Sequence, residues 1–449
     1  MFNGMPRRRA LGLATAALLA MTTGACNDFL QVKNPGAIQE QDVDNPAYIS
    51  LLVNGVIGEF QPAFSSTALY SGIFTDELAN FHGFSENIDI DRRAVGVSNG
   101  TYAGGVYTPL QSARFMADTV ASLLRSFLGD SAARDVRLAR SLDYAGYAYT
   151  LLAEQMCSAP INGGASESPD QLFGTALARF NDAIQVATAA STNAATSAAN
   201  KRSADSLLTL AQIGAARVSL DLGKAADAIG FATPVATNPA LDSTWGFRVY
   251  HSANTSREYD PFYAAASGGA SAEYVGITNT PYETLVGDPR IPHPTTTEKT
   301  QQGDAIVPNS PLMFSTYNGT ATGADFTRDA SITFASKLEA RYILAEAQGQ
   351  NATNLAFLNS RRAIGGDTPL VAPTDADYMA ALREQRARDL YLAGYRLGDL
   401  RRYIRLYKVD LFQTGTFKSP VPAPPTFGDQ TCWPIPQAEY TGNHNLPSP

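Results

Sequence analysis

Apolar residues recur at helical spacing through the middle of the chain, between residues 110 and 232. The apolar positions there step by three and four, which places them along one face of a helix. Three such series run Leu138, Leu142, Ala145, Tyr149, Leu152, Met156, then Phe173, Leu177, Phe180, Ile184, and then Leu207, Leu210, Gly214, Val218, Leu222. The pattern predicts consecutive helices that are rich in alanine and joined by short turns.

The same spacing predicts further helices in five other segments of the chain. They cover residues 46–60, 225–231, 332–348, 354–364 and 378–405. Small residues on paired helices allow close approach, and each pair then buries its apolar face on the next, as in tetratricopeptide repeats. The repeat signature is degenerate, so the prediction is of tetratricopeptide-like pairs only.

Three segments show no helical spacing of apolar residues. Residues 70–107 are rich in glycine and aromatic residues and are expected to form loops with short strands or helical turns. Residues 233–330 are rich in proline, glycine and threonine, and long irregular segments of this kind are usually functional. The tail, residues 417–449, is proline-rich and is expected to run extended. The predicted class is mostly α, with tetratricopeptide-like helical pairs packed against a loop-rich half that has few short strands.

Length and composition fit a folded globular protein, in one large unit or in two to three ordinary domains, and they exclude one class of partner. The chain has 449 residues, 44% of them hydrophobic and 17% charged, which is typical of a globular protein. Its formal net charge is -8, and nucleic-acid phosphates demand clustered lysine and arginine. Nucleic acid is therefore not expected as a partner.

The N-terminus has the form of a secretory signal peptide. A basic patch, Arg7 to Arg9, precedes an alanine-rich apolar run, and small residues then lead to Cys26. The position of Cys26 after Thr23, Gly24 and Ala25 resembles a lipobox, in which the cysteine is acylated and becomes the mature N-terminus. We therefore expect residues 1–25 to be removed and Cys26 to carry the lipid anchor. The alternative is ordinary cleavage that leaves Cys26 without lipid.

Two cysteines remain after the anchor, Cys157 and Cys432. Export would place them in an oxidising compartment, where an even pair is more often bridged than free. The expectation is a disulfide that fixes the tail to the helical body, and the alternative is two separately buried thiols.

Three segments in sequence resemble the SusD/RagB family of outer-membrane nutrient-uptake lipoproteins. Near the start, Cys26-Asn27-Asp28-Phe29-Leu30 is followed by Asn34-Pro35. Later, Gln385-Arg386-Ala387-Arg388-Asp389-Leu390 leads to Gly394, Arg396, Asp399 and Leu400, and the tail gives Pro434-Ile435-Pro436, then Glu439, Asn443 and Leu446. The chain departs from the family pattern at Gln385 and Ala393, where Glu is usual, and at His444, where Pro is common.

The resemblance covers the whole mature chain and implies both a fold and a partner. It implies a single unit over residues 26–449, with an N-terminal helical part (26–232), a loop-rich ligand-binding part (233–330) and C-terminal helices with an extended tail (331–449). It also implies a TonB-dependent β-barrel transporter, on which such proteins sit as a hinged lid at the outer membrane. The implied cargo is an oligosaccharide, or a peptide in some branches.

The sequence gives little support for catalysis or for a cofactor. The four histidines are scattered, and no HExxH, CxxC or G-x-S-x-G motif is present. Asp89 and Asp91 are the nearest local acidic pair, and salt bridges to Arg92 and Arg93 explain them more simply. We therefore expect no enzyme activity, no metal and no cofactor.

Sugar binding needs flat aromatic faces together with polar side chains that pair with hydroxyls. Two regions carry that mixture of residues. The candidate ligand contacts are Phe81, His82, Asn87, Arg92 and Tyr102 in the first region, and Trp245, Tyr250, Tyr259, Tyr263 and Tyr274 in the second. The expected site is a shallow aromatic-lined groove in which Trp245 is the first choice. The rival functions are a tetratricopeptide-type scaffold lipoprotein that binds only proteins and, as a further rival, a secreted hydrolase.

Overall fold

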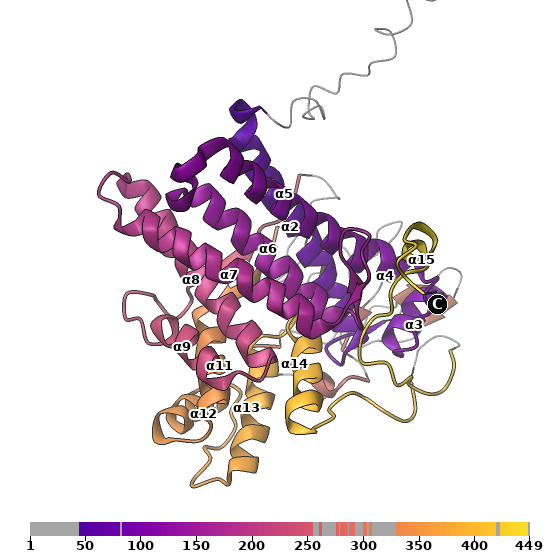
Figure 1. The fold of residues 1–449 in the computed structure, drawn as a ribbon. Helices are drawn as coiled ribbons and strands as arrows, with labels where there is room; N and C mark the ends of the chain where they lie inside the picture. The colour runs from indigo at the N-terminus through magenta and orange to yellow at the C-terminus, as the bar shows by residue number, and fades with distance from the viewer. Residues whose placement is uncertain are drawn as a thin grey trace, which may run out of the picture. The chain divides into compact units, whose positions relative to one another are not determined.

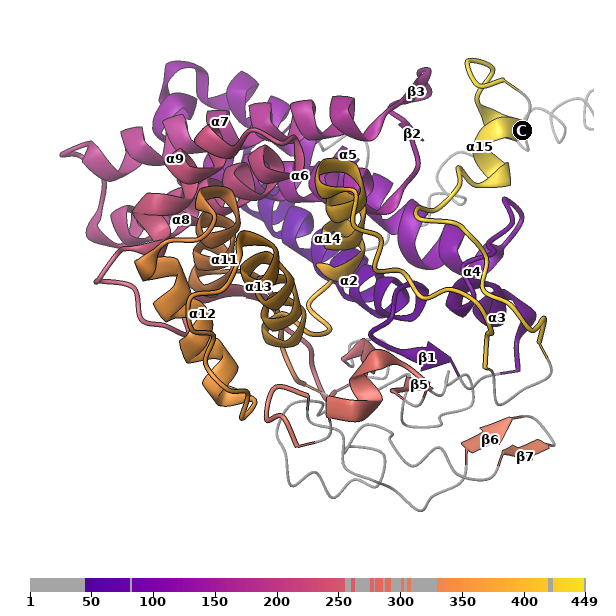
Figure 2. The ribbon, with the colours of Figure 1, turned by 90° about the horizontal axis from the view of Figure 1, so that it is seen from below.

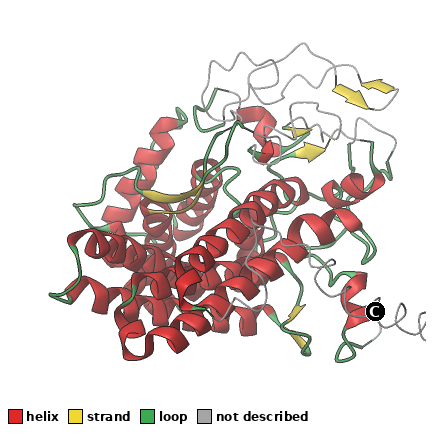
Figure 3. Cartoon of the chain, turned by 90° about the horizontal axis from the view of Figure 1, so that it is seen from above, coloured by secondary structure: helices red, strands yellow, loops and turns green. Residues whose placement is uncertain are grey.

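The computed structural model describes residues 45–80, 83–254, 260–262, 275–277, 279–285, 287–291, 300–302, 305–307, 329–418 and 423–447. Within these ranges the chain is mostly helical, as the sequence predicts, and the strands are short (Figure 3). None of the described helices combines the length and the apolar character needed to cross a membrane.

The elements of the first half follow in chain order. They are η2 (Pro46–Tyr48), α2 (Ile49–Phe74), β1 (Ala79–Asn80), α3 (Ser85–Asp91), α4 (Gly100–Tyr102), η3 (Ala103–Tyr107), α5 (Thr108–Leu128), η4 (Gly129–Arg134), α6 (Val136–Gln155), β2 (Ala159–Pro160), β3 (Ser166–Glu167), α7 (Pro169–Thr192), α8 (Ala198–Asp221) and α9 (Ala225–Ala236).

The second half has more strands and shorter helices. Its elements are β4 (Gly246–Val249), β5 (Val275–Gly276), η5 (Pro281–Leu285), β6 (Thr300–Gln302), β7 (Ala305–Val307), β8 (Ile332–Ser336), α11 (Lys337–Gln348), α12 (Ala352–Ile364), α13 (Asp375–Asp389), α14 (Arg396–Arg402), η7 (Tyr403–Tyr407) and α15 (Gln437–Gly442).

Helices α5 to α9 pack in sequence, each against the next (Figure 1). Helix α6 lies between α5 and α7 and also contacts α8 and α14, so nearly all of its side chains are buried. Glycine allows this close packing: a Cβ at Gly146 or Gly214 would come within 2.6 or 2.2 Å of the Phe180 ring. The small residues in the predicted series therefore serve helix approach, as expected for tetratricopeptide-like pairs.

Strand β8 joins the two halves of the core. Phe334 in β8 is fully buried, and its ring centroid lies 5.2 Å from that of Phe60 in α2 and 5.2 Å from that of Tyr147 in α6. Strand β8 pairs antiparallel with β4, and its last residue, Ser336, caps α11 by accepting a hydrogen bond from the backbone N–H of Glu339. Figure 2 shows α11, α12, α13 and α14 grouped beside the helices of the first half.

Two helix boundaries differ from the prediction. Residues 332–336 form strand β8 rather than the start of a helix, because they pair with β4, which lies far away in sequence. The helix predicted over residues 378–405 is interrupted between α13 and α14, where Leu392 and Gly394 adopt positive φ values of 57° and 76°. That turn directs Arg396 and Arg402 into the core.

The loop prediction for residues 70–107 was also incomplete. Helix α2 continues to Phe74, and the short helices α3 and α4 and the π-helical turn η3 follow it. The tail is extended apart from helix α15, and Cys432 within it is bonded to Cys157, with 5.0 Å between their Cα atoms. The disulfide expected from the sequence is thus present in the structure.

Candidate functional site

A pocket of about 510 Å³ opens beside Trp245. Its walls come from the end of α9 and the loop that follows, from β4 and β8, from α11 and α12, and from the segment around the end of α13. The lining residues are Ala236, Ser243, Thr244, Trp245, Arg248, Thr333, Ser336, Lys337, Leu338, Arg341, Phe357, Ser360, Arg361, Asp389, Leu390, Ala393 and Tyr395. We call this hollow the Trp245 pocket.

Backbone contacts hold Trp245 in place. Its carbonyl oxygen accepts a hydrogen bond from the N–H of Lys337 at 3.1 Å, where α11 begins. The Lys337 ammonium donates to the carbonyl oxygens of Asn238 and Leu241 at 2.8 and 2.7 Å, which fixes the loop before Trp245. The indole packs edge-on against Phe247, with 5.8 Å between ring centroids, and remains half-buried. Trp245 is therefore a positioned aromatic surface at the pocket wall.

Arg248 supplies a free guanidinium to the same pocket. Simple strand alternation would put Trp245 and Arg248 on opposite faces, but the β4–β8 register shifts between Phe247 and Arg248. A bulge of this kind redirects the side chains that follow it. Arg248 is exposed, and it makes no hydrogen bond or ion pair within the part of the chain that the structure describes. It is available to a ligand.

Arg341 and Phe357 form the opposite wall. The guanidinium carbon of Arg341 lies 4.5 Å from the centroid of the Phe357 ring, and one of its nitrogens donates to Asn354 Oδ1 at 2.8 Å. The lining of the Trp245 pocket thus includes three aromatic side chains, Trp245, Phe357 and Tyr395, and three guanidiniums, of which that of Arg361 is bound to Asp389. Aromatic faces for the apolar side of a sugar ring and fixed donors for its hydroxyls are what carbohydrate recognition requires.

Asp389 contributes the one carboxylate among the residues that line the Trp245 pocket. It is fully engaged: Arg361 donates two hydrogen bonds to it at 2.6 and 2.7 Å, and Arg290 and the Tyr342 hydroxyl donate as well. Its side chain has no exposed surface. Asp389 therefore stabilises the pocket floor and is not placed to act on a ligand.

A second hollow, of about 280 Å³, adjoins the Trp245 pocket. The two share Thr333, Asp389 and Ala393, and the second one continues toward Phe262 and Tyr391. Together they provide two adjoining hollows beside β8, of about 510 and 280 Å³.

Of the ten predicted ligand residues, Trp245 lines this surface, Tyr250 lines neither hollow, three others lie elsewhere in the described chain and five lie outside the described residues. Trp245 lines the pocket, and Tyr250 follows the end of β4 with 67% of its surface exposed. Tyr259, Tyr263, Tyr274, Phe81 and His82 lie outside the described residues, as does the anchor Cys26.

The prediction was wrong for Asn87 and Tyr102, and Arg92 is already paired. Asn87 and Tyr102 are buried, and the Tyr102 ring lies 5.4 Å from Trp433 of the tail, which covers this part of the chain. Arg92 donates to Asp89 at 3.1 Å, the salt bridge that the sequence favoured over an acidic pair. Burial also raises the pKa of Asp91 to about 8. These groups serve packing rather than ligand contact.

The two predicted regions do meet, but away from Trp245. Strand β1 of the first region pairs with β5 of the second, and a hollow of about 390 Å³ beside them is lined by residues from both regions and from the tail.

Sequence reasoning missed Arg248, Arg341 and Phe357. Arg248 follows closely after Trp245 and could have been found from that spacing, whereas the other two arrive from distant helices and carry no local signal.

The described residues contain no group of three or more His, Cys, Asp or Glu side chains arranged to hold a metal ion. Comparisons with known sequences give no match to a family model and none to a curated protein.

Comparisons with solved structures give a clear answer. A SusD superfamily protein from Parabacteroides distasonis superposes with a TM-score of 0.65 at 13% identity, covering 92% of this chain and 99% of that one. Surface glycan-binding protein A from Bacteroides thetaiotaomicron, in complex with laminarihexaose, gives 0.65 at 12% identity, covering 89% and 98%. The chain has a SusD-like fold. A laminarin-binding SusD-like protein gives 0.58 at 16% identity, covering 89% and 97%.

Within this SusD-like fold, the segment from Gln385 to Leu400 is held by buried ion pairs. Arg396 donates two hydrogen bonds to Asp76, both at 2.6 Å, and Arg386 donates to Asp399 at 2.7 Å. The Glu77 carboxylate accepts from the backbone N–H of Leu392 at 3.0 Å, and burial raises the pKa of Glu77 to about 8. These contacts join the end of α2 to the turn between α13 and α14, beside the Trp245 pocket.

Proposed function

We propose that this protein is a SusD/RagB-family lipoprotein that captures an oligosaccharide at the outer membrane and passes it to a TonB-dependent β-barrel transporter. The Trp245 pocket carries the proposal, because it combines an accessible indole, a free guanidinium and a second aromatic wall in one concave surface. The solved neighbours support the cargo class, since one is in complex with laminarihexaose and another is described as laminarin-binding.

Capture without turnover is the second part of the proposal. Glycoside hydrolysis by the usual route needs two carboxyl groups on either side of the scissile bond. Asp389 is the one carboxylate that lines the Trp245 pocket, and four hydrogen bonds from its neighbours occupy it. This environment suits binding and release, and it disfavours a hydrolase acting in this pocket.

The anchor follows from the sequence. Cys26 would carry lipid after removal of residues 1–25, and acylation by two or more chains gives stable membrane attachment where one chain does not. Mass spectrometry of the mature N-terminus tests this, and an unmodified Cys26 would contradict it.

A glycan and peptide array probed with the purified protein lacking residues 1–25 tests the function. The expected result is binding to one class of oligosaccharide, with no binding to peptides. Selective peptide binding would favour the peptide-uptake branch, and binding to neither class would favour a protein scaffold.

Replacing Trp245 by alanine should weaken oligosaccharide binding by about 1–3 kcal/mol, roughly 5- to 150-fold in Kd, because the stacking face is removed. Isothermal titration calorimetry with the best array glycan measures this. Phe115→Ala is the matched control, since Phe115 is an exposed aromatic on α5 that does not line the Trp245 pocket. Equal affinities of wild type and Trp245→Ala would show that the glycan binds elsewhere.

A further inference from the structure

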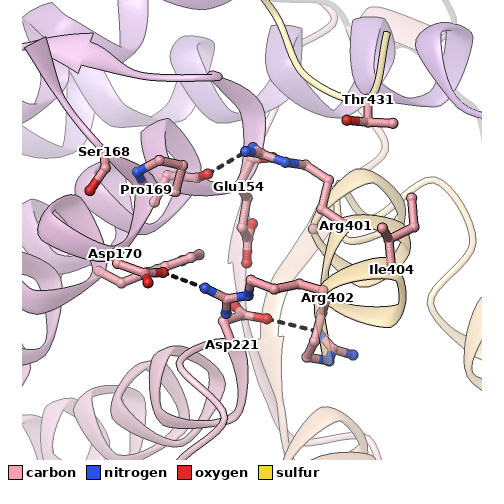
Figure 4. Close-up of a pocket in the computed structure, with 13 residues that line it drawn as sticks. Glu154, Ser168, Pro169, Asp170, Asp221, Arg401, Arg402, Ile404 and Thr431 are labelled. Atoms are coloured by element: carbon pink, nitrogen blue, oxygen red, sulfur yellow. Dashed lines mark hydrogen bonds and ion pairs between the residues drawn. The ribbon is translucent and has the colours of Figure 1, made fainter. Parts of the chain in front are cut away.

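Another pocket, of about 350 Å³ and separate from the hollows described above, lies at the ends of three of the paired helices (Figure 4). Helix α6 contributes Ala153 and Glu154 at its C-terminal end, α7 contributes Pro169, Asp170 and Phe173 at its N-terminal end, and α8 ends there with Asp221. Helix α14 and η7 close it with Gly398, Arg401, Arg402, Ile404 and Arg405, and Ser168 and Thr431 complete the lining. We call it the Glu154 pocket. It shares no lining residue with the Trp245 pocket.

Two carboxyl groups in the Glu154 pocket have acceptor oxygens that are not used. Glu154 is 4% exposed and Asp221 is 2% exposed. Neither Oε2 of Glu154 nor Oδ2 of Asp221 has a hydrogen-bond partner. In Figure 4 the Glu154 side chain points toward Asp221. Buried acceptors without donors are destabilising and uncommon in folded proteins, so such a pair calls for an explanation.

The fold makes room for Glu154 at a specific position. A Cβ at residue 398 would lie 2.8 Å from both Cγ and Cδ of Glu154, so Gly398 is what lets α14 approach this side chain. The nearest guanidinium on the far side, that of Arg217, lies 4.0 Å from Glu154 Oε1 and donates at 2.6 Å to Glu339 instead. Glu154 Oε1 thus has a long ion-pair contact with Arg217, whereas Oε2 has no partner.

The charges around the pocket select the ligand. Asp221 pairs with Arg402 at 2.9 Å, Asp170 pairs with Arg405, and Arg401 donates to the backbone carbonyl oxygens of Ala153, Glu154 and Met156. Three guanidiniums line the space and would repel a cationic ligand. Burial raises the pKa of the Glu154 and Asp221 carboxyl groups, which favours their neutral form and therefore a ligand without charge. What remains is a neutral molecule that donates hydrogen bonds.

The apolar walls narrow the choice further. Phe173, Pro169, Ile404 and Ala153 give the pocket hydrophobic sides, and its volume is near the lower end of ligand pockets, which run from about 300 to 1,000 Å³. We propose that the Glu154 pocket is a second carbohydrate site, which binds one neutral sugar ring with hydroxyls donating to Glu154 Oε2 and Asp221 Oδ2. This inference rests on the proposed function for its ligand class, but on different residues.

Saturation-transfer NMR with free neutral monosaccharides at pH 7.5 tests the site: D-glucose, D-galactose, D-mannose, D-xylose and N-acetyl-D-glucosamine. At least one should bind the wild-type protein, and Glu154→Leu should weaken that binding at least tenfold. Leucine removes the buried acceptor while keeping an apolar side chain, so thermal stability should stay the same or rise. A merely structural glutamate would give the opposite pattern, with lower stability and unchanged binding.

Three further arms keep the outcomes distinct. Asp182→Asn is the matched control: it removes an exposed carboxylate on α7 that does not line the Glu154 pocket, and it should leave monosaccharide binding unchanged. Trp245→Ala should also leave monosaccharide binding unchanged. The experiment therefore distinguishes failure of the proposed Glu154 site from failure of the proposed Trp245 site. Binding of methylammonium in place of every sugar, or binding of no monosaccharide by the wild type, would overturn the inference.

Discussion

Replacing Arg402 by leucine should lower the free energy of unfolding by about 3–5 kcal/mol. The Arg402 guanidinium is buried and pairs with Glu346, Asp221 and Asp399 at 2.9, 2.9 and 2.7 Å. Removing it leaves buried carboxylates without their counter-ion, which costs more than the pairs themselves contribute. Urea unfolding followed by circular dichroism measures the change.

Arg405→Leu is the matched control for this prediction. Arg405 stands three residues further along and pairs with Asp170, but both side chains reach solvent. An exposed pair contributes about 0–1 kcal/mol, so the control should unfold close to the wild type. Similar losses in the two variants would mean that the buried network around Arg402 contributes no more than a surface ion pair.

Removing the Cys157–Cys432 disulfide should produce the other large effect. The two cysteines are 275 residues apart in sequence, and closing so long a loop stabilises a protein by about 5–6 kcal/mol in the chain-entropy description. The double variant Cys157→Ala, Cys432→Ala should lose up to that amount, measured by urea unfolding under oxidising conditions.

Hydrogen bonds and packing beside the disulfide also hold the tail against the helical body. The backbone N–H of Cys157 donates to the Trp433 carbonyl oxygen at 2.9 Å, and the N–H of Trp433 donates to Gln155 at 3.0 Å. Trp433 is also fully buried against Phe74, with 4.6 Å between ring centroids. The native tail should therefore stay in place without the bridge. Reducing agent should destabilise the wild type but not the double variant, and a loss below about 1 kcal/mol would contradict the loop-closure argument.

The helices between residues 110 and 232 could be predicted from sequence because each buries one apolar face on its neighbour in the chain. In the series from Leu138 to Met156, for example, the helical spacing of apolar residues is visible within a single stretch of the chain. Strand β8 could not be found in this way, since its five residues are too few to show a period and its partner β4 is far away in sequence. Pairing and burial of Phe334 override the helical pattern that continues into α11.

The site was predictable only in part, for a related reason. Trp245 was found because its indole offers the largest stacking face for a sugar ring, together with an N–H donor. Asn87 and Tyr102 have the right chemistry for sugars but are buried, and Tyr102 packs against Trp433, which arrives from the far end of the chain. The Glu154 pocket is likewise assembled from the ends of helices that are separated in sequence.

The two tryptophans allow a direct test of glycan capture. Trp433 is fully buried, whereas Trp245 is half-buried at its pocket, so a stacked sugar should change the fluorescence of Trp245 alone. Titration with the best array glycan should give a saturable change that is absent in Trp245→Phe, with the glycan recovered at its original length. The same fluorescence change in Trp245→Phe, or a shortened glycan after incubation, would contradict capture at the Trp245 pocket.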